Sequence, residues 1–400
     1  MSLELKKRGD TWTFVVDIGR DPLTGKRKRK SKGGFKTKGE CRAAAAEIIS
    51  QFEKGTLIEE TDLNLEDYLR KWLKEYAAKN TAYSTYSRYT EIINKTINPR
   101  LGKVPLAKLT ALQIQEFYTY CIDTLKHSPN SVIRYHAVLS NALSMAVKWG
   151  LLNRNVCVNV SKPKKVHVEM KVLNESQLSK LLDGLKKTTL FIPVLIASQT
   201  GMRLGEICGL TWKAVDFDNS CLYVYSQLQP IDGKLLPVSL KTKSSRRKIT
   251  LSSLLVNEFK ELKNKQDLDR QDFGDGYNTG NYVVCQEDGR PYDPKYISGN
   301  FRRVIKEYKN KDGKCLAEQL EIPIIRFHDL RHTHATILLR ADINPKVVSE
   351  RLGHSSVSMT LDTYSHVLPD TQKDVANKLD EIFFTPTCQQ NANNDEFPTE

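Results

Sequence analysis

Apolar and polar residues alternate in the first part of the chain. This alternation over residues 11–16 and 26–31 predicts two strands, and the segment 21–25 between them has Pro and Gly placed as in a turn. An alanine-rich stretch over residues 40–52 then predicts a helix. The chain is therefore expected to begin with a small sheet and one helix.

A longer central region has helical periodicity throughout. From Asn64 to about Asn159, apolar and aromatic residues recur every three or four positions, which predicts a helical bundle. Further helices are expected in it over residues 84–97, 110–124 and 131–149. Because apolar stripes with this period usually form a core, we expect these side chains to be buried rather than to bind a ligand.

The last region mixes helices with a few strands. A capping box from Asn174 to Gln177 predicts the start of a helix. Strand-like runs follow at residues 222–228, 235–240 and 248–251, and the chain after them is again mostly helical. The pattern indicates helices around one small sheet.

The composition is typical of a folded protein with a polyanionic partner. The 400 residues include 61 Lys and Arg against 47 Asp and Glu, which leaves a net charge of +14. A hydrophobic fraction of 40% and a charged fraction of 27% exclude a wholly disordered, collagen-like or small disulfide-stapled chain. Excess positive charge favours a polyanionic partner, and the length favours two or three domains.

Neither a membrane segment nor a metal site is expected. No apolar run approaches the roughly 18 residues of a membrane span, and the first residues lack the apolar stretch of a signal peptide. The eight cysteines are scattered singly, with no C-x-x-C pair, so we interpret them as reduced thiols. The sequence therefore predicts a cytoplasmic protein that needs no cofactor and no metal.

Positive charge is concentrated near the amino terminus. Residues 1–38 hold twelve basic and four acidic side chains, which is more than half of the net charge. A basic strand beside Trp12 and Phe14 favours a surface that lies on DNA, although a solvated edge strand or a localisation-type tract is an alternative. The candidate DNA-binding residues form one run: Lys26, Arg27, Lys28, Arg29 and Lys30.

Four short segments in the last region carry candidate chemistry. Each segment alone is weak evidence for a catalytic role, because an Arg with a Glu three residues later is usually a surface pair, and a lone His or Tyr is usually structural. Their order is more demanding: an Arg, then H-x-x-R, then L-G-H with its His 23 residues after that second Arg, then a Tyr ten residues further. These residues are Arg203, His328, Arg331, His354 and Tyr364.

This pattern resembles the tyrosine recombinase, or phage integrase, family, and the likeness covers essentially residues 1–385. The layout is similar to that of lambda-type and conjugative-transposon integrases, which implies a multidomain, mainly α protein with small sheets. The implied parts are an arm-type DNA-binding domain with a three-stranded β-sheet plus helix (1–55), a helical, SAM-like core-binding domain (62–160), a mixed α+β catalytic domain (170–385) and a flexible tail (386–400).

The predicted chemistry is cleavage of a phosphodiester without a metal. Such a reaction needs a nucleophile, fixed positive charge at the phosphoryl oxygens and an acid for the leaving alkoxide. Arg203 and Arg331 can each present a planar fork to the phosphate. The resemblance implies that Tyr364 attacks to form a 3′-phosphotyrosyl link, that His328 accepts or relays its proton, and that His354 donates a hydrogen bond to the phosphate. Because the covalent link conserves the phosphoester energy, religation needs no ATP.

In the family the acid is a lysine on a hairpin of the small sheet. Lys241 occupies that place, and Lys243 is its rival because the length of the turn varies. A solvated basic hairpin that touches only the DNA backbone is the non-catalytic alternative. Glu206 lies one helical turn after Arg203, and we interpret it as the partner that orients this arginine.

Two neighbouring features are interpreted as structural or left open. Helical spacing is expected to turn His332 away from the face shared by His328 and Arg331, so we interpret His332 and His334 as structural. An apolar stripe in residues 371–384 predicts a helix. In relatives such a helix docks on a neighbouring protomer, and docking on its own domain is equally compatible with the stripe.

The overall prediction is a site-specific recombinase that integrates and excises a mobile element, either a phage or a conjugative transposon. Its expected partners are double-stranded DNA with core and arm sites and three further copies in a homotetramer, with a DNA-bending host protein and an excisionase as candidates. A resolvase or type IB-like topoisomerase is one alternative, and the basic amino-terminal sheet argues against it. A non-catalytic DNA-binding regulator is another, and the complete set of polar residues argues against it.

Overall fold

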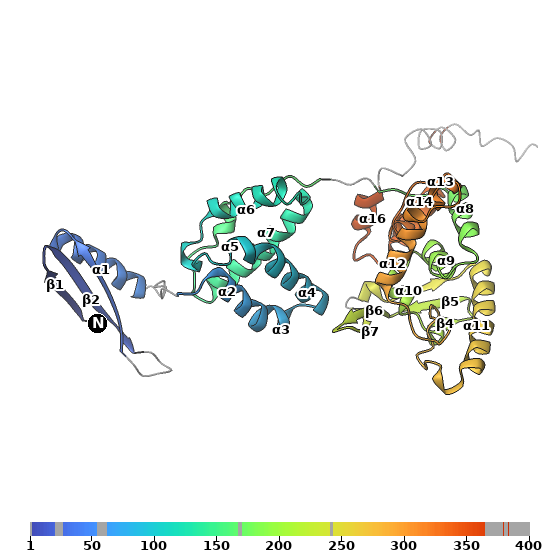
Figure 1. Cartoon of the computed structure of the whole chain (residues 1–400), viewed down its shortest axis with the longest axis horizontal. Coiled ribbons are helices and arrows are strands. Elements are labelled where there is room, and N and C mark those ends of the chain that lie inside the picture. Colours follow the sequence, from blue (N-terminus) through green and yellow to red (C-terminus); the bar gives the residue numbers. More distant parts are fainter. Residues whose placement is uncertain are drawn as a thin grey trace, which may run out of the picture. The chain divides into compact units, whose positions relative to one another are not determined.

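The computed structural model of the chain describes residues 2–20, 27–53, 62–166, 170–240 and 243–364, together with residues 379 and 383. The contacts group the chain into two compact units, Met1–Val168 and Glu169–Glu400, and each is described by itself (Figure 1). Several predicted features lie outside the described residues. These are the turn at 21–25, Lys26, Lys241, the tail 386–400 and, apart from two positions, the helix at 371–384.

The first unit begins with an antiparallel three-stranded sheet and a helix. Phe14 and Val16 are fully buried, and they cluster with Cys41 and Ala45 of the helix, which lies across one face of the sheet (Figure 1). The strands follow the order β1-β2-β3. The element bounds are β1 Leu3–Arg8, β2 Thr11–Arg20, β3 Arg27–Phe35 and α1 Lys38–Glu53.

Arg29 and Lys30 of the basic run lie on different faces of the sheet, because successive side chains of a strand point to opposite faces. In the register of β2 and β3, Lys30 lies opposite Val16, whereas Arg29 lies opposite Asp17. Lys30 therefore shares the face that α1 covers. Arg29 lies on the other face, where its Nε is 3.9 Å from a carboxylate oxygen of Asp17.

The rest of the first unit is all helical, and the predicted apolar stripe forms its core. Tyr68, Trp72 and Tyr118 are almost fully buried, and the Tyr68 hydroxyl donates to the carbonyl of Ala142 on a helix distant in sequence. Thr110 starts one helix with a capping box, because its side chain and that of Gln113 bond to each other's backbone amides. The bounds are α2 Leu65–Trp72, α3 Ala78–Asn80, α4 Tyr83–Ile92, α5 Asn98–Leu101, α6 Ala111–Asp123 and α7 Pro129–Lys148.

The second unit contains two small antiparallel sheets rather than the single sheet expected. The predicted strand over 222–228 is divided at Tyr225: its first half pairs within a three-stranded sheet, and its second half forms a hairpin. Asp232 and Gly233, both with positive φ, close this hairpin with a two-residue turn. The strands are β4 Val215–Asp216, β5 Cys221–Val224 and β8 Arg247–Thr250 in one sheet, and β6 Ser226–Ile231 and β7 Lys234–Ser239 in the other.

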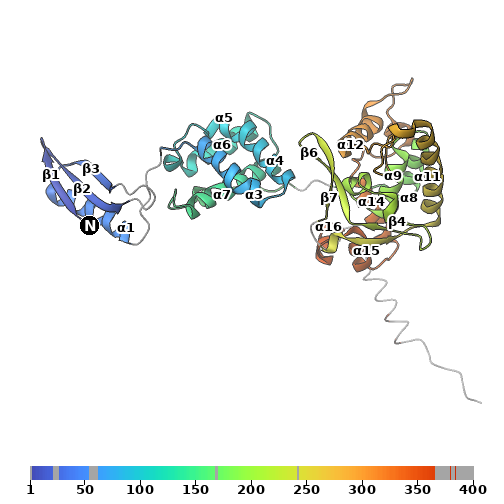
Figure 2. The ribbon, with the colours of Figure 1, turned by 90° about the horizontal axis from the view of Figure 1, so that it is seen from below.

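Helices form most of the second unit, as expected, so the prediction of a mainly α fold with small sheets is confirmed. α15 and α16 pack together at one edge of the unit (Figure 2). No helix within the described ranges is long and apolar enough to cross a bilayer. The helices are α8 Glu175–Leu185, α9 Phe191–Thr200, α10 Leu204–Cys208, α11 Ser253–Phe273, α12 Pro294–Arg302, α13 Leu316–Leu320, α14 Asp329–Arg340, α15 Pro345–Leu352 and α16 Val357–Tyr364.

α14 packs against α9 and α15 in this unit, and His334 of α14 forms hydrogen bonds to residues of both neighbours. Nδ1 of His334 lies 2.7 Å from the carbonyl of Ser198 on α9, so this nitrogen carries the proton and donates. Nε2 is then free to accept from Nε of Arg351 at 3.2 Å. The guanidinium of Arg351 also donates to the carbonyls of Gln199 and Thr250. This histidine is therefore structural, as the sequence predicts, and it has to be neutral.

Acid is expected to destabilise the second unit through His334. Burial, followed by the positive charge of Arg351, lowers the pKa of this imidazole to about 4 from its ordinary 6.5. The unfolded chain therefore binds the proton more readily, so the stabilisation is complete above about pH 6.5 and is lost as the pH falls toward 4. A loss on the order of 3 kcal/mol follows from about 1.4 kcal/mol per pKa unit. Urea unfolding of residues 170–400 at several pH values would measure it, and a His334→Gln variant with an unchanged acid dependence would contradict it.

Candidate active site

A tight turn after α9 places the first predicted arginine. Gly201 ends the helix with φ of 67°, and a Cβ there would lie 2.7 Å from side-chain atoms of His334 and Leu352, so glycine is required. Arg203 follows as the residue that precedes α10. Its backbone N–H and its Nη1 both donate to the carboxylate of Glu206, each at 2.9 Å. The predicted pairing of these two residues is therefore present.

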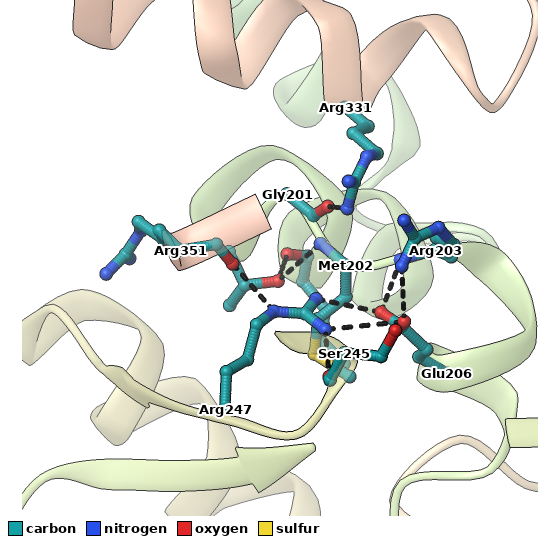
Figure 3. A network of polar contacts seen from close by, with 10 residues as sticks. Gly201, Met202, Arg203, Glu206, Ser245, Arg247, Arg331 and Arg351 are labelled. Atoms are coloured by element: carbon teal, nitrogen blue, oxygen red, sulfur yellow. Dashed lines mark hydrogen bonds and ion pairs between the residues drawn. The ribbon is translucent and has the colours of Figure 1, made fainter. Parts of the chain in front are cut away.

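Glu206 also binds a second arginine that the sequence analysis did not single out. Nη2 of Arg247, on β8, donates at 2.8 Å to Oε2 of Glu206, the oxygen that also accepts from the backbone N–H of Arg203. Nε of Arg247 donates to the carbonyl of Arg351 at 2.7 Å. Figure 3 shows Arg203 and Arg247 converging on this one carboxylate. Burial raises the pKa of Glu206, but the bonds and charges of the two arginines outweigh it and hold the pKa below its usual value. Glu206 thus remains ionised and fixes both guanidinium groups.

Arg331 is the most deeply buried of the predicted site residues that carry a permanent charge. It is 3% exposed, and its Nη1 donates to the carbonyl of Gly201 at 2.7 Å (Figure 3). Its Nη2 is buried and has no hydrogen-bond partner within the described part of the chain. Burial, and then the charges of Arg203 and Arg247, lower the pKa of Arg331 to about 9, which still leaves it protonated at neutral pH. A buried donor on a cation in such a position fits an anionic ligand.

Tyr364 lies at the end of α16 and contacts α14. It is 1% exposed, and its hydroxyl oxygen lies 2.7 Å from Nδ1 of His332. Burial raises the pKa of this phenol to about 12, and the charge of Arg331 partly opposes the rise. The predicted tyrosine is therefore close to the arginine cluster and is held by a histidine.

The interpretation of His332 as turned away from the site is wrong. It lies four residues, or about one turn, after His328, and such residues share a helix face. The rings of the two histidines lie edge to face with centroids 5.2 Å apart. His328 itself is exposed, and partial desolvation together with the charge of Arg331 lowers its pKa. The one-turn spacing from His328 was the signal that identifies His332.

His354 follows the Gly353 that ends α15. Its Nδ1 lies 2.8 Å from Oγ1 of Thr360, a fully buried residue of α16. Burial, and then the charges of Arg331 and Arg203, lower the pKa of His354 to about 4. Arg203, Arg331, His354, His328 and Tyr364 are thus brought into one electrostatic neighbourhood, although they are up to 161 positions apart in the chain.

The remaining features of the site are the predicted general acid and any group of metal ligands. Lys241 and the side chain of Lys243 lie outside the described residues, whereas the backbone of Lys243 begins the short turn Lys243–Ser245 that precedes β8. Over the ranges described, no group of three or more His, Cys, Asp or Glu residues could hold a metal ion. The described residues of the site therefore supply guanidinium, imidazole and phenol groups.

Replacing Glu206 with glutamine is expected to destabilise the second unit by about 3 kcal/mol, because it removes the charge that two partly or fully buried arginines share. Urea unfolding would measure the change. Asp267→Asn is the matched control, since this exposed carboxylate also pairs with two bases, Lys263 and Arg270. Its effect should stay below about 1 kcal/mol. Equal effects of the two substitutions would contradict the assigned role of Glu206.

Comparison with family models matches three consecutive parts of the chain. The phage integrase family model matches residues 171–370, the arm DNA-binding domain model residues 4–52, and the model of the phage integrase N-terminal SAM-like domain residues 64–122.

Relatives match over almost the whole chain. The "Tyrosine recombinase XerC-like" protein of Caldanaerobacter subterraneus subsp. tengcongensis is 28% identical over 398 residues, 95% of this chain and 98% of that protein. The ICEBs1 integrase of Bacillus subtilis is 27% identical over 380 residues, 94% of this chain and 99% of that protein.

Solved structures share the fold. The Tn1549 transposon integrase in complex with a circular intermediate DNA has a TM-score of 0.65 and 23% identity, over 79% of this chain and 99% of that one. A lambda integrase tetramer bound to a Holliday junction has a TM-score of 0.56 and 19% identity, over 92% and 95%. The family model spans half of the chain and includes all the assembled arginines, histidines and the tyrosine, so the chain belongs to the phage integrase family of tyrosine recombinases.

Proposed function

We propose that this recombinase cuts one DNA strand with Tyr364 and rejoins it to a second duplex, and so integrates and excises a phage or conjugative transposon. The buried Nη2 donor of Arg331, which has no partner among the described residues, carries the proposal. It lies on a permanently charged group beside Arg203 and Tyr364, where a phosphate oxygen would complete its hydrogen bonding.

Each polar residue has a distinct role in the proposed reaction. Arg203 and Arg331 bind the non-bridging oxygens of the scissile phosphate and stabilise the charge that develops on them. With Thr360 donating to Nδ1 of His354, the imidazole proton is on Nε2, which can donate to the same phosphate. Tyr364 attacks phosphorus to form a 3′-phosphotyrosyl link, and Lys241, or alternatively Lys243, protonates the leaving 5′-oxygen. Religation is the reverse reaction.

Different domains of the chain bind different DNA sites in this proposal. Residues 1–55 bind arm-type sites through the basic strand that includes Arg27, Lys28, Arg29 and Lys30, with Lys26 next to it, while residues 62–160 and 170–385 bind the core site. Separate buried clusters in the sheet, in the helical bundle and in the second unit support this division, as do the three matched family models.

The proposal includes an assembly and accessory factors. The lambda integrase tetramer on a Holliday junction supports a homotetramer of this chain on two core sites. A DNA-bending host protein and an excisionase would set the direction of the reaction. The protein would act in the bacterial cytoplasm, where its chromosomal DNA substrate is located.

Covalent trapping tests this function. The protein is incubated in EDTA with a nicked duplex that carries the attachment core of the encoding element, or a scrambled core as control. A protein–DNA band on a denaturing gel, with the nucleotide on the tryptic peptide that contains Tyr364, supports the proposal. DNA binding that is specific for the core, without any covalent band, would favour a non-catalytic regulator. Relaxation of supercoiled DNA without joining of two sites would favour a topoisomerase.

Deleting residues 1–55 is expected to abolish binding to arm-site DNA while core-site cleavage stays measurable. The removed segment has its own sheet and its own buried cluster, so the rest of the chain should fold without it. Mobility shifts with arm and core duplexes, together with trapping on the nicked core, measure both activities. Loss of all cleavage in the truncated protein would contradict the division, as would arm-site affinity that does not fall with added salt in the full-length chain.

A further inference from the structure

The nucleophile of the proposed reaction is held by a histidine that the sequence motif does not assign. Nδ1 of His332 lies 2.7 Å from the hydroxyl oxygen of Tyr364, and the two rings have centroids 5.7 Å apart. Tyr364 is almost fully buried, so water does not compete freely for this oxygen. His328, the predicted acceptor of the phenolic proton, makes no hydrogen bond to Tyr364 in the described structure, and its ring contacts that of His332 instead.

We propose that His332, rather than His328, accepts the proton of Tyr364 as its oxygen attacks the phosphate, an inference that rests on the proposed function. The distance of 2.7 Å is within the hydrogen-bond reach that a general base requires. With the imidazole proton on Nε2, Nδ1 presents its lone pair to the hydroxyl.

The surroundings keep His332 neutral before DNA binds. Burial, and then the electrostatic effect of His328 and the positive charges of Arg331 and Arg326, lower the pKa of His332 to about 4, and Asp329 opposes them only in part. Among the described residues, His354, after α15, and Tyr364 of α16 are further titratable groups near this ring. His332 is therefore an unprotonated acceptor at neutral pH. A phosphate anion bound at Arg331 would raise the pKa of His332, and His332 would then be a stronger base at the time of attack.

The step is balanced in atoms and charge. The bond between phosphorus and the Tyr364 oxygen forms as the bond between phosphorus and the 5′-oxygen breaks. The phenolic proton moves to Nδ1 of His332, and a separate acid gives a proton to the leaving 5′-oxygen. During religation the imidazolium of His332 returns its proton to the departing phenolate. His328, whose ring lies edge to face with this one, would position His332.

Single-turnover trapping with a His332→Asn variant tests the assignment. Asparagine can retain a hydrogen-bonding atom near the position of Nδ1, but it cannot take the proton. We expect the cleavage rate to fall by roughly 10²-fold, in line with the usual contribution of general base catalysis, with core-site affinity unchanged. The matched control is His136→Asn, because Nδ1 of His136 also lies 2.9 Å from a buried tyrosine hydroxyl, that of Tyr118 in the helical bundle. This control should cleave at the wild-type rate.

Two further measurements separate proton acceptance from a packing effect. Incorporating a fluorinated tyrosine at position 364 lowers the pKa of the nucleophile. This lower pKa should reduce the fall in cleavage rate that His332→Asn causes. A core duplex with a 5′-bridging sulfur at the scissile phosphate needs no acid for its leaving group, and it should leave the loss unchanged.

The outcomes distinguish the two proposals. If the wild-type protein forms no covalent complex, the proposed function fails. If it does and His332→Asn cleaves equally fast, or if the loss is rescued by the bridging sulfur and not by the fluorinated tyrosine, His332 is not the proton acceptor. A larger loss in His328→Asn that responds to fluorination would return this role to His328.

Discussion

Replacing Tyr364 with phenylalanine is expected to abolish the covalent protein–DNA complex and to slow cleavage by roughly 10⁴-fold or more. The variant lacks the attacking oxygen, whereas its ring can remain in the buried cluster that includes Leu339 and Leu352. It loses one hydrogen bond, that with His332, at a cost of about 1 kcal/mol. The protein should therefore stay folded and bind core-site DNA with its normal affinity.

Trapping on the nicked core and mobility shifts on the intact core measure these two properties. Tyr118→Phe is the matched control, because it also removes a buried hydroxyl bonded to a histidine but leaves the proposed site intact. The control should form the covalent complex at the wild-type rate. An undiminished band from Tyr364→Phe would move the nucleophile elsewhere, and equal losses in both variants would point to unfolding.

Replacing Arg331 with lysine is expected to slow cleavage by roughly 10³-fold while it changes the affinity for core DNA by less than about tenfold. The guanidinium of Arg331 presents two donors: Nη1 donates to the carbonyl of Gly201, and Nη2 is available to the phosphate in the proposed reaction. A lysine carries the same charge on a single nitrogen, so it cannot present both donors in a fixed fork. The loss should therefore appear in the cleavage step, where the charge on the phosphate increases.

Single-turnover rates at saturating protein, compared with binding isotherms, measure the two effects. Arg340→Lys is the control, since Arg340 lies on the same helix but is exposed at its far end. It should leave both quantities unchanged. A cleavage rate for Arg331→Lys within tenfold of the wild type would show that charge alone is sufficient at this position.

The order and spacing of the motifs, together with the family that they resemble, selected Arg203, Arg331 and Tyr364, and the structure brings these three residues close together. The same reasoning did not find Arg247. Its partner Glu206 is 41 residues away, and no local pattern distinguishes it from the other bases of residues 241–248. His332 was misassigned for a different reason: its helix face was predicted incorrectly, although its one-turn spacing from His328 was visible.

Periodicity alone also determined most of the architecture: the amino-terminal sheet and helix, the aromatic core of the helical bundle, and the helical character of the second unit all follow from local side-chain patterns. It could not show that the run 222–228 divides between two sheets, because strand pairing depends on distant partners. Only the tertiary structure decided which groups meet at the site. The turn at Gly201, the carboxylate of Glu206 and the contact between α14 and α16 set the distances among charges that are far apart in the chain. These distances determine the pKa values and the hydrogen bonds of the candidate site.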